Sequence, residues 1–237
     1  CLRCFILMSI AIIPARIGSK RVLKKNIKDF CGKPMISYAI EVAQRSELFE
    51  EIIVSTDSNE VEEIALSLGA KIPFKRPSSI SDDITPTVPV ISHAIKECIK
   101  NGFNFNYVCC IYPCVPFLEI SDLKDSFKKI KDNKANYCFA ISEYNSNILR
   151  SFKINKEGKI EKIFPRNELI RTQDLDASYF DAGQFYWGKK NVWLDSLNIH
   201  DNGIPHIIPN WRAIDIDTND DWLRAEHLYS VLNKIEL

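Results

Sequence analysis

The chain has 237 residues, of which 46% are hydrophobic and 26% are charged, so it is long enough to bury a sizeable core in one large α/β domain or two small ones. Lysine plus arginine and aspartate plus glutamate each number 31, so the net charge is zero, which argues against a nucleic-acid or membrane-surface protein. No apolar run approaches the ~20 residues of a membrane span.

Residues 1–7 precede Met8, and we interpret them as an upstream extension with Met8 as the natural start. The alternative is a signal peptide that runs to Pro14, but it lacks a small-residue cleavage site and its removal would delete the first strand. The eight cysteines include no pair of C-x-x-C motifs. We therefore interpret them as reduced and mostly buried in a cytoplasmic protein.

Strand and helix patterns alternate from residue 9 to residue 142. Such alternation predicts an α/β fold with a doubly wound, mostly parallel sheet. One helix is expected to start at Thr85 as N-cap, with Pro86 at the first helical position. The expected strands cover residues 9–15, 51–56, 70–74, 107–112 and 137–142, and the expected helices cover residues 34–45, 60–68, 86–101 and 123–130.

The first expected strand leads into a strongly cationic loop that also contains Gly18 and Ser19. Free backbone N–H groups and small residues let a chain wrap closely around a polyphosphate, and cations neutralise it. Neither the G-x-x-x-x-G-K-[ST] pattern nor the G-x-G-x-x-G pattern is present, so this would be a phosphate site of another kind. The cations are Arg16, Lys20, Arg21, Lys24 and Lys25.

Ligands of doubly wound sheets bind at the carboxyl ends of the strands. Loops that begin near Arg16, Asp57, Arg76 and Pro113 each follow an expected strand, so we expect them to share one face of the molecule. Arg76 suits bidentate contacts with phosphate. The rest of its loop, to residue 83, fits an ordinary surface loop before the next helix.

The pattern changes between residues 143 and 182. Two short strand-like runs flank a turn at residues 156–159 and predict a β-hairpin. Arg166 and Arg171 follow it, and they fit either carboxylate binding or solvated surface charge. Strands at residues 184–187, 204–208 and 213–217 and a helix from residue 219 complete the chain. We therefore expect one domain over residues 1–237, with an excursion at residues 143–182.

Asp215 and Asp217 flank Ile216 in the last expected strand. Alternate residues of a strand face the same side, so both carboxylates would point one way while Ile216 packs into the core. Two carboxylates at that spacing suit Mg²⁺, with substrate phosphates completing its coordination. The alternative is a pair of solvated aspartates before a helix N-terminus, where negative charge is favourable. The nearby polyphosphate loop favours the metal site.

The four histidines lack the spacing of metal ligands, and no G-x-S-x-G elbow is present. The sequence therefore does not indicate covalent catalysis. It indicates phosphoryl-type chemistry that depends on substrate positioning and a metal ion.

Five motifs spread over almost the whole chain resemble the cytidylyltransferases that activate acidic sugars as CMP derivatives. They are residues 13–26, Gly32-Lys-Pro-Met35, Ile53-Val-Ser-Thr-Asp57, Arg76-Pro77 with Ser81-Asp82, and Ile214-Asp-Ile-Asp-Thr218. The resemblance implies a nucleotide-diphospho-sugar transferase type of fold, Mg²⁺ as cofactor, and a homodimer formed through the excursion. It also implies an enzyme that converts CTP and a nonulosonic acid, a nine-carbon acidic sugar, into a CMP-sugar and pyrophosphate.

The resemblance implies a role for each residue that matches a family motif. Catalysis would fall to Arg16, Lys20, Asp215 and Asp217, with the two aspartates holding Mg²⁺. The triphosphate and cytidine would be bound by Ala15, Arg16, Ser19, Lys20, Lys25, Asn26, Arg76 and Thr87. The sugar would be bound by Tyr112, Arg166, Arg171, Gln173, Gln184 and Tyr186.

The stretch of residues 171–188 looks like that of family members that use pseudaminic acid. Members that use N-acetylneuraminic acid tend to have Gln where Tyr112 stands and Asn-Gly where Ala182-Gly183 stands. Cys114-Val115 departs from the small polar residue and alanine expected between the flanking prolines, close to the expected sugar pocket. The product would serve bacterial surface or flagellin glycosylation.

Legionaminate, neuraminate and the eight-carbon Kdo are alternative sugars for the same chemistry. A non-catalytic nucleotide-binding protein of this fold would be expected to lose Lys20 or one of the two aspartates, and all are present. A glycosyltransferase usually carries its Asp-x-Asp motif after a mid-chain strand, whereas this motif lies near the C-terminus.

Overall fold

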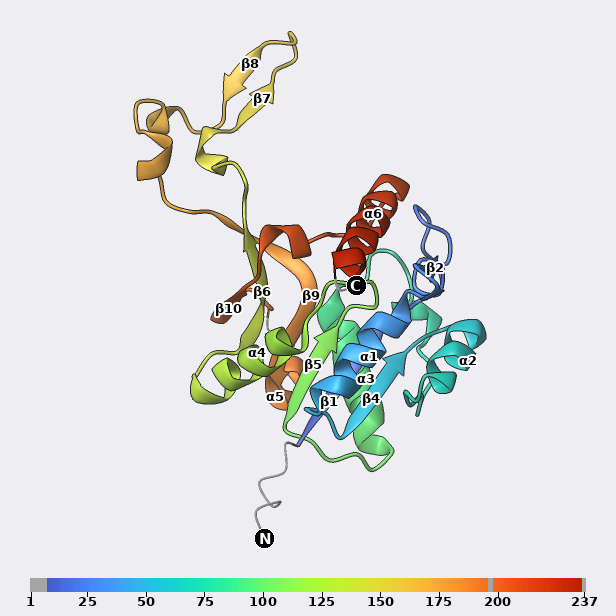
Figure 1. The fold of residues 1–237 in the computed structure, drawn as a ribbon. Coiled ribbons are helices and arrows are strands. Elements are labelled where there is room, and N and C mark those ends of the chain that lie inside the picture. The colour runs from blue at the N-terminus through green and yellow to red at the C-terminus, as the bar shows by residue number, and fades with distance from the viewer. Residues whose placement is uncertain (1–7, 196–197, 236–237) are drawn as a thin grey trace.

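A computed structural model describes residues 8–195 and 198–235 of the chain (Figure 1). The expectation for residues 1–7 therefore lies outside the described residues. At the centre is a six-stranded sheet in the order β10-β6-β9-β5-β1-β4. Its strands are β1 (Ser9–Pro14), β4 (Glu51–Ser55), β5 (Tyr107–Ile111), β6 (Tyr137–Glu143), β9 (Tyr179–Lys189) and β10 (Gly203–Ile207).

The sheet is mostly parallel, as predicted. β1 pairs in parallel with both β4 and β5, and β10 pairs in parallel with β6. β9 runs antiparallel between β5 and β6 and joins the two parallel sets. The nearly continuous apolar sequence of β1 reflects its position, because a central parallel strand is covered on both faces.

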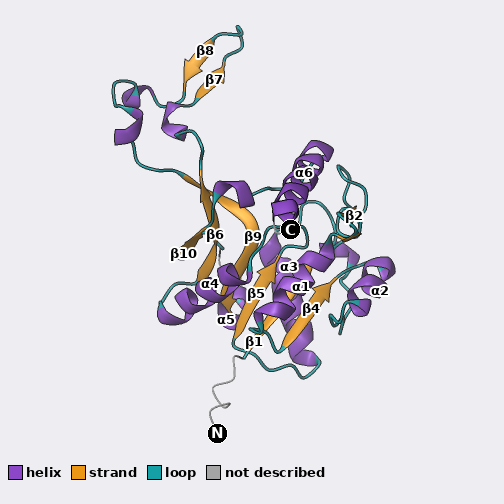
Figure 2. Ribbon diagram, in the orientation of Figure 1, coloured by secondary structure: helices purple, strands orange, loops and turns teal. Residues whose placement is uncertain are grey.

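Helices cover both faces of the sheet, which confirms the doubly wound class (Figure 2). One apolar cluster joins alternate residues of β1 to α1 (Ile36–Ser46), α2 (Asn59–Ser67) and α4 (Ile120–Asp132). The opposite cluster joins the intervening residues of β1 to α3 (Thr87–Lys100) and α5 (Lys190–Leu194). In the described part of the chain, no helix combines the length and the apolar character needed to cross a membrane.

A third apolar cluster holds the last helix, α6 (Asn219–Ile235), against the body. Trp222 of α6 packs edge-to-face on Phe30, with ring centroids 5.4 Å apart. Phe30 belongs to a minimal hairpin of β2 (Asp29–Phe30) and β3 (Lys33–Pro34) that follows the cationic loop. Ile214 and Ile216 are buried in the same cluster, so it also anchors the segment that carries the two aspartates.

The excursion extends away from the body as a separate projection (Figure 1). Its hairpin of β7 (Phe152–Ile154) and β8 (Ile160–Lys162) pairs as predicted and is followed by short 3-10 turns. Large apolar side chains of the excursion remain exposed in this single chain, including Ile154 at 77%, Ile160 at 74% and Leu169 at 95%.

Two expected strands are absent from the described residues, and both predictions were wrong. Residues 70–74 make a single bridge, between Lys71 and Ile53, and Pro73 beside it cannot donate to a ladder. Residues 213–217 pair with no strand, although Ile214 and Ile216 are buried while Asp215 is exposed. In residues 213–217, the alternation of burial comes from packing of Ile214 and Ile216 on α6 and not from a hydrogen-bonded strand ladder.

Two boundaries also differ from the prediction. Thr85 is not an N-cap, because α3 begins at Thr87 and the Thr85 hydroxyl instead donates to Asp82, 2.7 Å away. β9 is longer than the predicted residues 184–187, because it continues across a register shift. Gly183 lies at that shift with φ of +60°, a conformation that glycine adopts readily.

Candidate active site

A cavity of about 520 Å³ opens at the carboxyl ends of β1 and β5. The loops after β1, β4 and β5 meet there, as predicted, and Asp57 after β4 accepts a hydrogen bond from the Ile17 N–H at 3.2 Å. Its volume suits a ligand of nucleotide size. The predicted site residues that line it are Arg16, Ser19, Lys20, Lys25, Asn26, Arg76, Thr87, Tyr112, Asp215 and Asp217.

The cationic loop is folded back on itself by a buried asparagine. The Asn26 side-chain amide donates to the Arg16 carbonyl at 2.8 Å, and the Asn26 carbonyl accepts from the N–H of Ile36 at 2.8 Å. This fold turns Arg21 into the cavity beside the predicted cations. Lys24 points elsewhere, because it pairs with Glu60 at 2.8 Å. Asn26 therefore fixes the shape of the cationic loop through its own hydrogen bonds.

Asp83 forms ion pairs with two of the cavity's cations. Its carboxylate pairs with Lys20 at 2.6 Å and with Arg16, and the hydrogen bonds from Lys20 and Arg16 lower its pKa. The carboxylate thus occupies the positions that phosphate oxygens would take. Our sequence analysis missed Asp83, because its partners lie more than 60 residues earlier in the chain; the signal was a carboxylate in the loop that Arg76 begins.

Asp217 pairs with the remaining cations of the loop, with Arg21 at 2.5 Å and with Lys25 at 3.1 Å. Lys25 also donates to the Ile216 carbonyl at 2.6 Å, which fixes the carboxylate segment against the loop. Asp215 is different. No group among the described residues forms a hydrogen bond or ion pair with it. Although the residue as a whole is exposed, desolvation by the surrounding cavity wall raises its pKa, and the charge of Asp217 raises it further.

This carboxylate, which has no direct partner among the described residues, lies beside a second one, and the pair fits a hard divalent cation. Carboxylate oxygens are the ligands that Mg²⁺ prefers, and a positive ion would relieve the repulsion that raises the Asp215 pKa. The described residues contain no cluster of three potential protein ligands. A cation held by Asp215 and Asp217 would therefore take its other ligands from water and phosphate oxygens.

Arg76 is a fixed part of the cavity wall. It is 5% exposed, and its Nε donates to the Ser55 hydroxyl at 3.1 Å. Burial lowers its pKa to about 10, so the guanidinium stays charged at neutral pH. Held against the end of β4, it presents a permanent positive charge to an anionic ligand.

Two hydroxyl groups form a neutral part of the wall. The Tyr112 and Thr87 hydroxyls lie 2.5 Å apart, and burial raises the pKa of Tyr112 to about 12. Tyr186, which we predicted to contact the sugar, does not line this cavity. It lies behind Tyr112, with ring centroids 5.4 Å apart, and its hydroxyl donates to Asp181 at 3.0 Å. The Cys114 thiol also lines the cavity and donates to the Asn26 side-chain oxygen at 3.3 Å.

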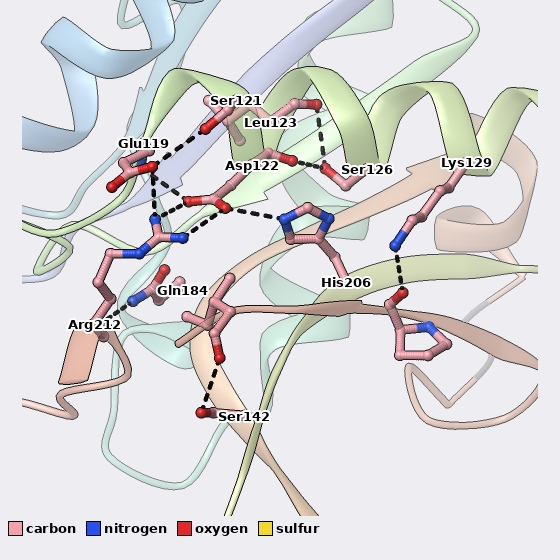
Figure 3. Close-up of polar contacts among 12 residues, drawn as sticks. Glu119, Ser121, Asp122, Leu123, Ser126, Lys129, Ser142, Gln184, His206 and Arg212 are labelled. Carbon is pink, nitrogen blue, oxygen red and sulfur yellow. Dashed lines mark hydrogen bonds and ion pairs between the residues drawn. The ribbon is translucent and has the colours of Figure 1, made fainter. Parts of the chain in front are cut away.

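Five other predicted residues do not line this chain's cavity. Ala15 is buried beneath it, with its N–H on the Ser55 carbonyl at 2.9 Å. Gln184 is turned away into the interior, where its amide donates to the Arg212 carbonyl at 2.6 Å (Figure 3). Contact of Gln184 with the sugar therefore stays a prediction, and in this structure the side chain faces the interior. Exposed positions on the excursion are occupied by Arg166, Arg171 and Gln173.

A cationic loop after the first strand, a carboxylate pair in the same cavity, and a mostly parallel sheet are together typical of an α/β nucleotidyltransferase. Residues 10–202 match the Cytidylyltransferase family, and the chain belongs to that family.

Relatives of the chain agree with this placement over nearly its whole length. The pseudaminic acid cytidylyltransferase of Campylobacter jejuni serotype O:2 is 38% identical over 227 residues, which are 94% of this chain and 97% of the relative. The CMP-N,N'-diacetyllegionaminic acid synthase of Legionella pneumophila is 26% identical over 92% of this chain and 95% of its own. A solved CMP:2-keto-3-deoxy-manno-octonic acid synthetase complexed with CTP shares the fold, with a TM-score of 0.71, 17% identity and coverage of 94% and 98%.

The variant Asp215→Asn should be more stable than the native protein at neutral pH. The folded state raises the Asp215 pKa, so it binds that proton more tightly than the unfolded state does, and stability falls as pH rises through the raised pKa. Urea unfolding in metal-free buffer at pH 7 should give the variant the larger free energy of unfolding. The difference should disappear below the ordinary aspartate pKa of about 3.9.

Asp217→Asn provides the control, because it removes the partner of Arg21 and Lys25 and should not stabilise the fold. Equal or lower stability of the Asp215 variant at pH 7 would contradict this account of the site.

Proposed function

We propose that this protein transfers the CMP group of CTP to pseudaminic acid, giving CMP-pseudaminic acid and pyrophosphate. The observation that carries the choice of sugar is the 38% identity, over 94% of the chain, to an enzyme of that name. The nucleotidyl transfer is supported by the site itself, where five cations and the predicted pair of carboxylates, Asp215 and Asp217, share one cavity.

The proposed reaction is a direct in-line displacement. The anomeric hydroxyl oxygen of the sugar attacks the α-phosphorus of CTP and forms the new O–P bond, and its proton is released to water. The bond from the α-phosphorus to the pyrophosphate oxygen breaks, and pyrophosphate leaves. Arg16 and Lys20 would exchange Asp83 for the triphosphate and stabilise its developing charge. Removing one well-placed group of this kind costs about 10²–10³ in rate. Arg76 and Lys25 would hold the nucleotide in line.

Mg²⁺ is the proposed cofactor, and Asp215 and Asp217 would hold it. When bound, it would neutralise phosphate charge and lower the pKa of the attacking hydroxyl. Asp215 is available for this role, since no described group pairs with it. Asp217 would release Arg21 and Lys25, whose charges then become available to phosphate oxygens.

A homodimer formed through the excursion is also part of the proposal. An isolated two-stranded hairpin is marginally stable in water, yet β7 and β8 stand apart with Ile154, Ile160 and Leu169 largely exposed. A second copy would cover these side chains. It would also allow the excursion of one copy to reach the cavity of the other, which is how Arg166 or Arg171 would meet a sugar carboxylate.

We further propose a cytoplasmic enzyme whose product serves flagellin or other surface glycosylation. The cysteines in the described part of the chain are unpaired, as is usual in a reducing compartment.

Pyrophosphate release tests the proposed function directly. The protein, CTP and Mg²⁺ should release pyrophosphate with pseudaminic acid, and at most slowly with legionaminic acid, N-acetylneuraminic acid or Kdo. Release with another of these sugars and not with pseudaminic acid would keep the chemistry and overturn the sugar. Release with none of them would favour a non-catalytic nucleotide-binding protein.

The variant Asp215→Asn separates a metal role from a nucleotide-binding role. Turnover should fall by about 10²-fold or more, because a charge needed in the transition state is lost, while CTP affinity should change little. Steady-state pyrophosphate release and equilibrium CTP binding measure the two quantities. Asp220→Asn, an exposed aspartate outside the cavity, is the matched control and should leave both unchanged. Equal losses of turnover and affinity would count against the metal role.

The variant Ile154→Asp tests the dimer. A charge on this exposed isoleucine of β7 should prevent burial against a second copy, so sedimentation equilibrium should show the native protein as a dimer and the variant as a monomer. Leu66→Asp on α2 is the control, since Leu66 is exposed at 50% on the body. A monomeric native protein, or a variant that remains dimeric, would overturn the proposed interface.

A further inference from the structure

Three buried ionisable side chains contact one another beside α4 (Figure 3). Asp122 of α4 is 3% exposed, Arg212 of the 3-10 turn Asn210–Arg212 is 6% exposed, and His206 of β10 is 8% exposed. None of them lines the cavity. Removing charges from water costs free energy that a close pair regains only with good geometry. The cluster therefore needs an account beyond the chemistry already described.

The geometry of the cluster is well suited to holding Arg212 in one orientation. The Asp122 carboxylate accepts two hydrogen bonds from its guanidinium, from Nη1 at 2.5 Å and from Nη2 at 3.1 Å. His206 Nε2 lies 3.0 Å from the same carboxylate, and Glu119 lies 3.4 Å from Arg212 Nη1. Burial alone would raise the pKa of Asp122, but the hydrogen bonds from His206 and Arg212 keep it below its ordinary value. The ionised Asp122 carboxylate therefore binds the planar Arg212 guanidinium in a bidentate manner.

The main chain of Arg212 connects the Asp122–Arg212 ion pair to two parts of the cavity wall. Its carbonyl accepts the Gln184 side-chain amide at 2.6 Å, and the residue before Gln184 is Gly183, which lines the cavity. Arg212 also lies three residues before Asp215 in the chain. One buried arginine therefore holds the shifted part of β9 and the beginning of the carboxylate segment.

The carboxylate segment depends on such anchors because it lacks a ladder. No strand pairs with residues 213–217 in the described structure. At its far end, the N–H of Asp217 donates to the Asp221 side chain at 3.3 Å, and Lys25 holds the Ile216 carbonyl. At its near end, the Asp122–Arg212 pair is the buried polar attachment.

We propose that Asp122 and Arg212 form a buried clamp that positions Asp215 and Asp217, and so sets the affinity of the cavity for a divalent cation. The inference rests on the proposed function in one respect, that Asp215 and Asp217 hold the cation. Asp122 and Arg212 act as positioning residues, since neither contacts the cavity. Groups that orient metal-binding residues from behind change metal affinity by about 10–100-fold when they are lost.

A purely structural role is the competing account, because Asp122 also caps α4. Its carboxylate accepts from the Glu119 N–H at 3.1 Å in a capping box. Loss of the cap would reduce stability without changing the cavity. The test must therefore measure metal binding in folded protein and include a variant that loses a buried hydrogen bond elsewhere.

Mn²⁺ binding, measured by electron paramagnetic resonance of the free ion, provides a readout that is independent of activity. Asp122→Asn should bind Mn²⁺ at least ~10-fold more weakly than the native protein, because asparagine cannot accept both guanidinium bonds. Arg212→Lys keeps the charge without the fork and should also bind more weakly. Ser142→Ala is the control, since it deletes the buried bond of Ser142 to the Ile208 carbonyl, 3.1 Å long, and should bind Mn²⁺ like the native protein. Near-ultraviolet circular dichroism and urea unfolding verify that each variant is folded during the measurement.

The outcomes separate the clamp from the proposed function. Unchanged Mn²⁺ affinity in Asp122→Asn, or equal weakening in Ser142→Ala, would overturn the clamp and leave the nucleotidyl transfer standing. Failure of the native protein to bind Mn²⁺ would overturn the metal role of Asp215 and Asp217, and the clamp with it. Should Asp122→Asn not fold, Arg212→Lys decides alone: weaker binding supports the clamp, and unchanged binding overturns it.

Discussion

Parallel pairing of β1 with β4 and β5 is the constraint on which the rest of this molecule depends. Parallel neighbours end at the same edge of a sheet, so the loops that leave them are brought together whatever their sequences. Arg16 and Tyr112, which are far apart in the chain, thereby line one cavity, and Arg76 joins them through its hydrogen bond to Ser55 at the end of β4. The buried strands carry little chemistry themselves, and they act by placing the chemistry at their ends.

The sequence pattern predicted correctly those parts of the structure that depend on residues close together in the chain. The cationic loop and the Asp215–Asp217 pair were recognisable because residue types and spacing alone specify their chemistry. Alternating burial at Ile214 and Ile216 was also correct, yet the strand inferred from it was not, since packing on α6 produces the same alternation as a ladder. Periodicity reports which side chains are covered and leaves open what covers them.

The missed features depend on distant contacts. Asp83 became a site residue only through Arg16 and Lys20, which come from another loop. Gln184 faces the interior, where its side-chain amide donates to the Arg212 carbonyl, and the register shift of β9 lies beside it. No spacing within the chain encodes either event. The antiparallel insertion of β9 between β5 and β6 was hidden for the same reason, because strand order is a property of the whole sheet.

Ion pairs within the cavity have a consequence for how an anionic ligand arrives. Lys20 and Arg16 pair with Asp83, and Arg21 and Lys25 pair with Asp217. With Arg76, Asp82 and Asp215 included, five cations and four carboxylates line the cavity, and the whole chain is neutral. The free protein therefore projects little positive field into solvent, so long-range steering adds little to the encounter rate. These partly exposed pairs are individually weak and exchange readily. Attraction for phosphate would develop only at contact distance, where the ligand interacts with the charges, the shape and the hydroxyl groups of the cavity wall together.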